Sequence, residues 1–299
     1  MGVSLVKHEA EYRAVQELST EKNYHITTLC ELLDIQRSAY YKWLHREKSQ
    51  RERENEKLME QIKEAYEERD GILGYRQMTL KIRRESDTIV NHKRVYRLMQ
   101  VMGLKSVCRR KRKVYIKSTP QITAENKLNR DFHAKQIHEK WLTDVTELKY
   151  GNGQKAYLSA ILDLGDRSIV SYVLGKSNNN ALVFHTFDKA VSNYTEAKPL
   201  FHSDRGFQYT SKIFKGKLDQ AGMVQSMSRV GRCIDNGPME GFFAIFKTEM
   251  FHLYKFSDFE SLESAVDDYM DYYNNQRYQK RLNGMTPMEY RHYLTATVA

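Results

Sequence analysis

Residues 141–150, WLTDVTELKY, decide the fold that we expect for this chain. Their apolar and β-branched side chains predict a buried strand, and the runs at residues 156–164 and 168–174 predict two more. Turn signals separate these runs, Gly151-Asn152-Gly153 after the first and Gly165-Asp166 after the second. Strands joined by such tight turns pair as antiparallel neighbours, so we expect a three-stranded meander.

Downstream of the meander, the pattern alternates between helix and strand. Residues 181–194 and 212–221 have helical character, whereas residues 199–203 and 224–227 are short strand-like runs. A long helical stretch follows from Asn236. Three hairpin strands followed by alternating helices and strands predict an α/β layout, in the order of a ribonuclease-H-like sheet.

The first 117 residues are rich in good helix formers and predict a helical region. Two segments in it have the pattern of helix-turn-helix units, residues 26–44 and residues 75–103. In the first of them, we expect Leu29, Leu32 and Leu33 to form one buried stripe. The fold class is therefore mixed, with a helical N-terminal region, an α/β ribonuclease-H-like catalytic domain and C-terminal helices.

Changes in composition divide the chain into four parts. We expect a first helical unit over residues 1–50 and a second, with a basic tail, over residues 51–117. Residues 118–138 are expected to be a linker. The catalytic domain with its C-terminal helices is expected over residues 139–299.

Basic residues gather at the end of the second helical unit. Its last predicted helix places Lys93, Arg94 and Arg97 on the solvent-facing side. Residues 104–117, which follow, contain no acidic residue. The candidates for phosphate contact in that run are Arg109, Arg110, Lys111, Arg112 and Lys113. Such a helix can lie in the major groove of DNA. A helical hairpin with a solvated basic face, followed by a solvated linker, fits the same pattern.

Composition narrows the class of protein. The net charge of +10, from 48 basic and 38 acidic residues, favours a polyanionic partner such as DNA or RNA. The sequence has no run of about 18 apolar residues, the length that spans a bilayer, and residues 1–20 lack the apolar core of a signal peptide. Three scattered cysteines argue against a disulfide framework and against a zinc finger. We expect a cytoplasmic protein.

Three carboxylates stand out by their position. Asp144 interrupts a predicted buried strand, where an ionised group is costly unless it is paired or binds metal. Asp204 ends the strand at residues 199–203, and strand ends of α/β sheets are where ligands usually bind. Glu240 lies in the first turn of a helix that Asp235 or Asn236 can cap and that Pro238 suits.

The spacing of these acids adds to the pattern. Between Asp144 and Asp204 lie 59 residues, and between Asp204 and Glu240 lie 35. Lys247 is seven positions after Glu240, about two helical turns, so it returns to the same helix face. Glu249 is nine positions after Glu240 and points to the opposite face.

Oxygen ligands of this kind suit Mg²⁺ or Mn²⁺. Two such ions can activate an attacking oxygen and stabilise the leaving one in a phosphoryl transfer. The alternative for each residue is a structural role without metal binding. Strand aspartates are often edge residues, and glutamates in the first turn of a helix often interact with the helix dipole. Residue chemistry alone leaves both interpretations open.

At these residues the sequence resembles a known family. The blocks WLTDVTEL, FHSDRGFQYTS and NGPMEGFFAIFKTEM are similar to the three catalytic blocks of insertion-sequence transposases of the IS-three type, whose core is like that of retroviral integrases. GYRQMTLKI, VNHKRVYRLMQVMGLKS and YNNQRYQKRLNGMTPMEYR are similar to other recurring blocks of that family. The resemblance runs from about residue 20 to residue 295.

The resemblance implies a ribonuclease-H-like core that cuts at transposon ends and joins the exposed 3′ hydroxyl to another DNA strand. It implies that Asp144, Asp204 and Glu240 are catalytic metal ligands for Mg²⁺ or Mn²⁺, with two ions bound, and that Lys247 contacts DNA. The implied partners are transposon ends and target DNA. An upstream-frame product fused by frameshifting is a further possible partner, and joining two ends suggests a homo-oligomer on DNA.

Two alternatives share part of this evidence. A nuclease of the same fold would only hydrolyse nucleic acid with the same metal ions. A non-catalytic DNA-binding regulator would use the helix-turn-helix units and an inert second domain. The intact acidic triad with Lys247 argues against the regulator, whereas separating the transposase from the nuclease requires a substrate.

Overall fold

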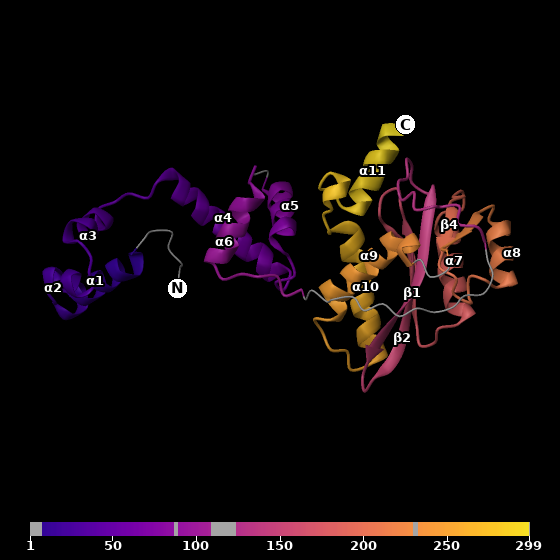
Figure 1. Ribbon diagram of the computed structural model, residues 1–299, viewed down its shortest axis with the longest axis horizontal. Coiled ribbons are helices and arrows are strands. Elements are labelled where there is room, and N and C mark those ends of the chain that lie inside the picture. Colours follow the sequence, from indigo (N-terminus) through magenta and orange to yellow (C-terminus); the bar gives the residue numbers. More distant parts are fainter. Residues whose placement is uncertain (1–7, 87–88, 109–123, 230–232, 299) are drawn as a thin grey trace. The chain divides into compact units, whose positions relative to one another are not determined.

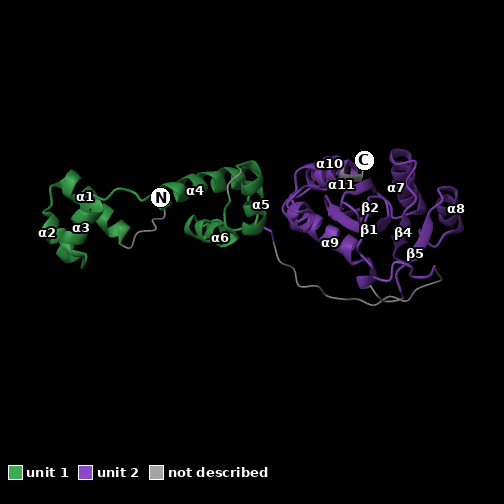
Figure 2. Cartoon of the chain, turned by 90° about the horizontal axis from the view of Figure 1, so that it is seen from above, with its two compact units in different colours: residues 1–106 green, residues 107–299 purple. Residues whose placement is uncertain are grey.

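The structure, a computed structural model, describes residues 8–86, 89–108, 124–229 and 233–298 of the chain. The chain forms two compact units, Met1–Ser106 and Val107–Ala299, which Figure 2 shows in different colours. We describe each unit by itself. None of the described helices is both long and apolar enough to cross a membrane.

The first unit is helical, and its helices form two groups, each with a core of its own. The described helices are α1 (Glu9–Lys22), α2 (Ile26–Leu32), α3 (Arg37–Leu44), α4 (Gln50–Glu68), α5 (Tyr75–Glu85) and α6 (His92–Val101). The first core holds Tyr12, Val15, Leu29, Cys30 and Tyr40.

The stripe predicted in the first helix-turn-helix segment is partly wrong. Leu29 is buried, but Leu32 is 80% exposed. Leu32 is the last residue of α2, and the neighbouring Cys30 takes the inward position beside Leu29. Three leucines close in sequence therefore do not all fit one face of a two-turn helix.

The second helical group, α4 to α6, follows the predicted pattern closely. Ser49 and Glu52 form a capping box that begins α4. Val95, Leu98 and Met99 of α6 are buried against residues of α4 and α5. After α6, Gly103 has a φ of 70°, the left-handed conformation that commonly ends a helix.

The second unit is an α/β domain. Its strands are β1 (Lys140–Tyr150), β2 (Gln154–Asp163), β3 (Ile169–Gly175), β4 (Leu200–Ser203) and β5 (Val224–Met227). Its helices are α7 (Asn180–Asn193), α8 (Lys212–Gln220), α9 (Gly237–Phe246), α10 (Phe259–Asn275) and α11 (Pro287–Val298). Short irregular turns of helix complete it, namely η1 (Cys233–Asn236), the π-helix η2 (Lys247–Phe251) and η3 (Lys280–Leu282).

The five strands form one sheet in the order β3-β2-β1-β4-β5. The meander β1-β2-β3 is antiparallel, as predicted, and β4 and β5 add to it in parallel. The β1–β2 hairpin turns through Gly151 and Gly153, which both have positive φ. This ribonuclease-H-like sheet and its alternating helices confirm the predicted fold class.

Helices cover both faces of the sheet. Figure 1 shows α7 and α8 on one side and α9 and α10 on the other, and Figure 2 gives the same arrangement from above. Trp141 packs with residues of α7 and α8, whereas the next residue, Leu142, packs with residues of α9 and α10. Both faces of β1 are therefore buried near its start.

Residues 124–138, which the sequence assigns to a linker, pack on the α/β unit in the structure. Leu128 is 1% exposed, and its backbone N–H donates to the Ser226 hydroxyl. The Asn126 side chain donates to Asp235 at 3.0 Å. The sequence does not predict this packing, because the segment is polar, lacks periodicity and is anchored by single residues.

A buried ion pair ties η2 to the segment after α10. The Arg277 guanidinium donates two hydrogen bonds to the Glu249 carboxylate, at 2.8 and 2.7 Å, and the Tyr269 hydroxyl donates a third at 3.0 Å. The side chains of Arg277 and Glu249 are only 9% and 13% exposed. This pair holds the end of the α9–η2 segment against α10.

We expect Arg277→Met to lower the free energy of unfolding of the second unit by about 3–5 kcal/mol, because it leaves a buried carboxylate without a partner. The measurement is urea unfolding followed by Trp141 fluorescence in a Trp43→Phe background. Lys280→Met, which removes an exposed cation nearby, is the control. Equal effects of the two substitutions would contradict a stabilising role for the pair.

Candidate active site

Asp144 lies in β1, the central strand of the sheet. Side chains alternate between faces along a strand, so Asp144 shares its face with Leu142, which packs against α9 and α10. Its Oδ1 accepts a hydrogen bond from the Val145 backbone N–H at 2.8 Å. The carboxylate therefore faces the helix that carries Glu240.

Asp204 immediately follows β4, which pairs in parallel with β1. In that pairing, Leu142 lies beside His202. Continuing the register by two residues puts Asp204 next to Asp144, with both side chains on the same face. The Gly206 backbone N–H donates to Asp204 Oδ1 at 2.8 Å. A Cβ at Gly206 would lie 3.0 Å from that oxygen, so the turn needs a glycine there.

Glu240 lies in the first turn of α9, which packs on β1 in Figure 1. Pro238 occupies an early helical position, as predicted. The predicted side-chain cap is wrong, because neither Asp235 nor Asn236 caps the helix through its side chain. The Asn236 side chain instead donates to the Thr143 carbonyl at 3.0 Å, which ties the start of α9 to the residue before Asp144.

A second anchor of α9 is the buried carboxylate of Asp235. It accepts hydrogen bonds from the side chains of Arg229, Arg130 and Asn126, at 2.9, 2.6 and 3.0 Å. The hydrogen bonds from Arg229 hold the pKa of Asp235 well below its usual range. Asp235 therefore stays ionised and joins three separate segments just before α9.

The charges of the other two predicted acids act on Asp144. Burial raises the pKa of Asp144 to about 8, and the charges of Asp204 and Glu240 contribute to the rise. Lys247 acts in the opposite direction and lowers the pKa of Asp144. Burial also raises the pKa of Asp204, against the hydrogen bond from Gly206. Asp204, Glu240 and Lys247 thus lie near enough to Asp144 to change its pKa.

Glu249, the rival acid, lies elsewhere. Its carboxylate is taken up by the buried pair with Arg277, and Tyr269 completes its hydrogen bonds. The prediction that Glu249 points away from the triad agrees with this arrangement. Lys247 directly follows α9, and the π-helix begins only there. The seven-residue helical spacing therefore still puts Lys247 on the same helix face as Glu240.

Tyr209 is a neighbour of the acids that the sequence did not single out. It is 1% exposed, and its hydroxyl lies 3.2 Å from that of Thr143. Burial, with the charges of Asp144 and Asp204, raises the pKa of Tyr209 far above its usual range. A neutral phenol therefore lies near the two aspartates, on the Thr143 face of β1. A tyrosine five residues after Asp204 carried no distinguishing signal in the sequence.

The donor set consists of carboxylate oxygens, which are the ligands that Mg²⁺ and Mn²⁺ prefer. One oxygen of Asp144 and one of Asp204 accept backbone N–H groups, which orients the two carboxylates. Within the described residues, no three His, Cys, Asp or Glu side chains are close enough together to hold a metal ion. The acids fit a divalent ion by their chemistry and charge.

Lesser candidates are mostly structural. His202 is fully buried between the hydroxyls of Ser226 and Ser228, and burial lowers its pKa to about 4. Asp163 accepts the Gly165 N–H at 2.8 Å, a contact within the β2–β3 turn. Arg205 donates to the Ser228 carbonyl at 2.7 Å.

In the first unit, α6 carries the predicted DNA contacts. Lys93 and Arg97 are exposed. Arg94 is half-buried, donates to Asn55 at 2.9 Å and pairs with Glu54, so it also holds α6 against α4. The predicted contacts Arg109, Arg110, Lys111, Arg112 and Lys113 lie outside the described residues.

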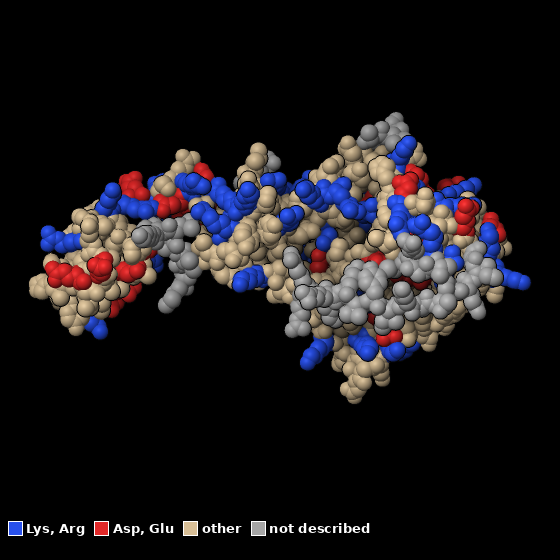
Figure 3. Space-filling view, viewed as in Figure 1, with Lys and Arg blue, Asp and Glu red and all other residues tan. Residues whose placement is uncertain are grey.

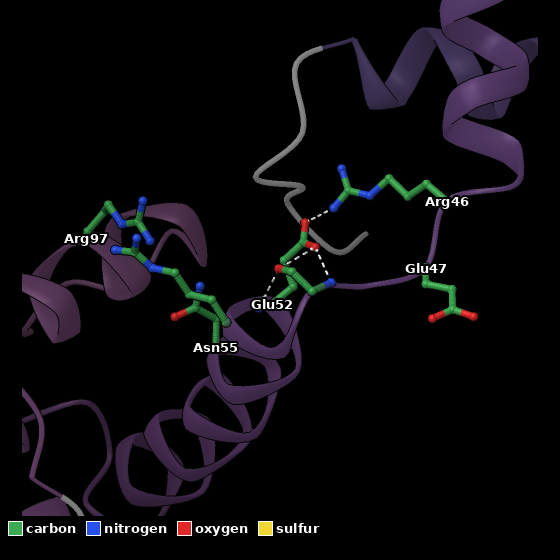
Figure 4. A pocket seen from close by; sticks show the side chains of 7 residues that line it. Arg46, Glu47, Glu52, Asn55 and Arg97 are labelled. Carbon is green, nitrogen blue, oxygen red and sulfur yellow. Dashed lines mark hydrogen bonds and ion pairs between the residues drawn. The ribbon is translucent and has the colours of Figure 1, made fainter.

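Arg97 borders a cavity of about 540 Å³ that α4 and the segment before it also line. Figure 4 shows Arg97 and Arg46 around this cavity, with Arg46 paired to Glu52. Arg51 is a third arginine in the lining. Figure 3 shows Lys and Arg side chains gathered along the α4–α6 part of the unit. This surface is the basic face that the sequence predicted.

Comparisons with family models divide the chain in the same way. A model described as an HTH-like domain matches residues 52–112. Two models described as an integrase core domain match residues 134–233 and 240–293. The first core segment contains Asp144 and Asp204, and the second begins at Glu240.

Individual relatives cover most of the chain. The putative transposase InsK for insertion sequence element IS150, from Escherichia coli K12, is 38% identical over 90% of this chain and 94% of its own length. An uncharacterized transposase-like protein from Haemophilus influenzae is 42% identical over 72% of this chain and 98% of its own length. A solved HTLV-2 integrase catalytic core domain in complex with magnesium is 21% identical, covers 54% of this chain and 100% of that domain, and has a TM-score of 0.44. The chain belongs to the insertion-sequence transposases of the IS-three type and is a DNA transposase.

Proposed function

We propose that Asp144, Asp204 and Glu240 are the catalytic residues of this transposase and hold two Mg²⁺ or Mn²⁺ ions. The convergence of three acids from β1, the end of β4 and the start of α9 supports this assignment. Bound ions would supply Lewis-acid activation of the attacking oxygen and stabilisation of the leaving oxygen. The activity proposed is cleavage at transposon ends followed by strand transfer.

The residues of the chain itself have distinct parts in this proposal. Asp144 and Asp204 are oriented by backbone N–H groups, which keeps their remaining oxygens in a defined direction. Lys247 adjoins the acids, where its ammonium can bind a DNA phosphate and offset their negative charge. The buried Tyr209 supports β1 from the Thr143 face, near the two aspartates.

The partners proposed are transposon ends and target DNA, bound in part by Lys93, Arg94 and Arg97 on α6 and by Arg109 to Lys113 in the basic run. Joining two ends in one reaction requires two active sites near each other, so we propose a homo-oligomer on DNA. We also propose that this chain can be fused to the product of an upstream reading frame, which would supply further segments that bind the transposon ends.

Asp144→Asn, Asp204→Asn and Glu240→Gln are each expected to reduce cleavage and joining at least about a hundredfold, because metal-assisted charge stabilisation contributes several kcal/mol. The assay uses a labelled duplex that carries one end of the element, with Mg²⁺ or Mn²⁺. Glu147→Gln is the matched control, since Glu147 lies on β1, is exposed and pairs with Lys155. Full activity in the three variants would refute the assignment.

The same assay separates the transposase from a nuclease of this fold. Joined strand-transfer product is the expected result. Cut ends without any joined product, at every metal and target concentration, would favour the nuclease. Specific binding of the end without cutting would favour a non-catalytic regulator.

The raised pKa of Asp144 predicts a pH effect on the metal-free protein. Its pKa is about 8 when folded and near 3.8 when unfolded, so folding favours the protonated form and stability falls as pH rises from about 4 to 8. Asp144→Asn stays neutral. In EDTA, its melting temperature relative to the unmodified protein should therefore rise steadily from pH 4 to pH 8. A difference that does not change with pH would contradict this prediction.

Lys93→Ala and Arg97→Ala are expected to weaken DNA binding by similar factors for all sequences, as lost phosphate contacts do. Each should also reduce the slope of log K against log salt by about 0.9. Fluorescence anisotropy with a labelled duplex measures both effects. Lys57→Ala, which removes an exposed cation of α4, is the control. Slopes that match the control in both variants would argue against α6 as the DNA-binding helix.

A further inference from the structure

A second cavity lies in the α/β unit, beside α9, and none of the three acids lines it. Its volume is about 530 Å³. We call it the α9 groove. Its lining comes from α9, the end of β2, the β2–β3 turn, Phe132 and the segment after α10. The lining residues used below are Arg167, Pro238, Gly241, Ile245, Gln279 and Arg281.

Two arginines border this groove. Arg167 is half-buried and donates to the Phe132 carbonyl at 3.1 Å, while Arg281 is exposed. Burial and the like charge of Arg281 lower the pKa of Arg167 to about 10. Among the described residues, no carboxylate forms an ion pair with either guanidinium. The nearby acid Asp163 is fully buried and pairs with Arg291 and His138.

An amide donor adds to the positive charge. The Gln279 Nε2 is buried and makes no hydrogen bond of normal geometry to the described residues. It lies close enough to the Tyr273 hydroxyl to act against the rise in the pKa of that phenol. Buried donors are nearly always satisfied in native proteins, so an unsatisfied one beside two cations indicates a site for an acceptor group. An anion with several oxygens would satisfy the amide and both guanidiniums together.

A glycine keeps the groove open. Gly241 lies inside α9, and a Cβ built on it would meet no atom within 4 Å. Alanine would fit there and would stabilise the helix by about 1 kcal/mol. Packing inside the unit therefore does not require glycine at this position. Its effect is to leave the backbone of α9 accessible from the groove.

The groove adjoins the candidate active site. Successive residues of a helix are about 100° apart, so the face of Gly241 is roughly a quarter turn from that of Glu240. Pro238 and Ile245 extend the lining along α9 with apolar surface. A chain that follows this groove runs alongside the helix that carries Glu240 and Lys247.

We propose that the α9 groove binds the sugar–phosphate backbone of one DNA strand, with a phosphate between Arg167 and Arg281. The Gln279 amide donates to the same phosphate, and the adjoining sugar lies on Pro238 and Ile245. Planar guanidiniums suit phosphate oxygens, and the apolar lining suits the carbon face of deoxyribose. The proposal rests on the proposed function, since this strand would be the one presented to Asp144, Asp204 and Glu240.

The charge test uses the full chain in EDTA with a fluorescein-labelled duplex of about 30 base pairs over a series of KCl concentrations. Arg281→Ala should weaken binding several-fold and reduce the slope of log K against log salt by about 0.9, because one phosphate contact is lost. Lys280→Ala removes the same charge from the same turn, outside the groove lining, and should change the slope by less than half as much. Equal slopes for the two variants would overturn the proposal.

The steric test uses Gly241→Leu, with Gly241→Ala as the matched control. Both variants should melt no lower than the unmodified protein, because both residues favour helix more than glycine does. Gly241→Leu should bind DNA several-fold more weakly than Gly241→Ala. The double variant Gly241→Leu with Arg281→Ala should be no weaker than the weaker single variant, since both substitutions act on one contact. Equal DNA affinity of the leucine and alanine variants would overturn the proposal, as expected if the groove held an acidic peptide.

These results do not depend on the catalytic assignment. Failure of the proposed function would appear as retained strand transfer in the carboxylate variants, in the presence of metal. The groove experiments measure DNA affinity without metal. A wrong metal site and a wrong DNA groove therefore give different patterns of results.

Discussion

The parallel pairing of β4 with β1 is the constraint on which the candidate site depends. Before β4 joins, the sheet is an antiparallel meander with one acid, Asp144, on a half-buried face. The register that puts Leu142 beside His202 brings Asp204 to the same height on the same face. Two carboxylates that are buried side by side favour proton or cation binding over a paired anionic state. Burial raises the pKa values of both aspartates, and the charge of Asp204 adds to the rise for Asp144.

Helix α9 is held over this pair by polar contacts at both ends. At its start, Asn236 bonds to the carbonyl of Thr143, and the buried Asp235 joins it to two arginines from other segments. At its end, the π-helix η2 directs Glu249 into the buried pair with Arg277. Anchoring at both ends sets the height of Glu240 and Lys247 relative to β1. The apolar contacts of Phe242 and Phe246 supply burial energy, but they do not by themselves define that height.

The same helix separates two kinds of surface. Glu240 and Lys247 face the acids, whereas Gly241 and Ile245 open to the α9 groove with its two arginines. The closing block of the sequence, YNNQRYQKRLNGMTP, therefore has more than one part in the fold. Asn274 bonds to the backbone of β3 and Arg277 anchors η2, while Gln279 and Arg281 line the groove. The first half of the block thus anchors neighbouring elements, and the second half lines the groove.

The sequence by itself determined the strands, the helices and the order in which they occur, and it singled out the three candidate acids, because strand alternation, helical periodicity, turn residues and family motifs are local patterns. It also ruled out Glu249, since helical phase is local as well. Only the tertiary structure decided what Asp235 and Asn236 do and that Tyr209 lies near the aspartates. It alone decided that residues 124–138 belong to the α/β unit and that Arg281 and Gly241 share a groove. Each of these depends on a contact between residues far apart in the chain, often made by one side chain. A periodic sequence pattern cannot encode such a contact. The free energy of the contact comes from burial and hydrogen bonding, which exist only after the sheet and its helices have packed.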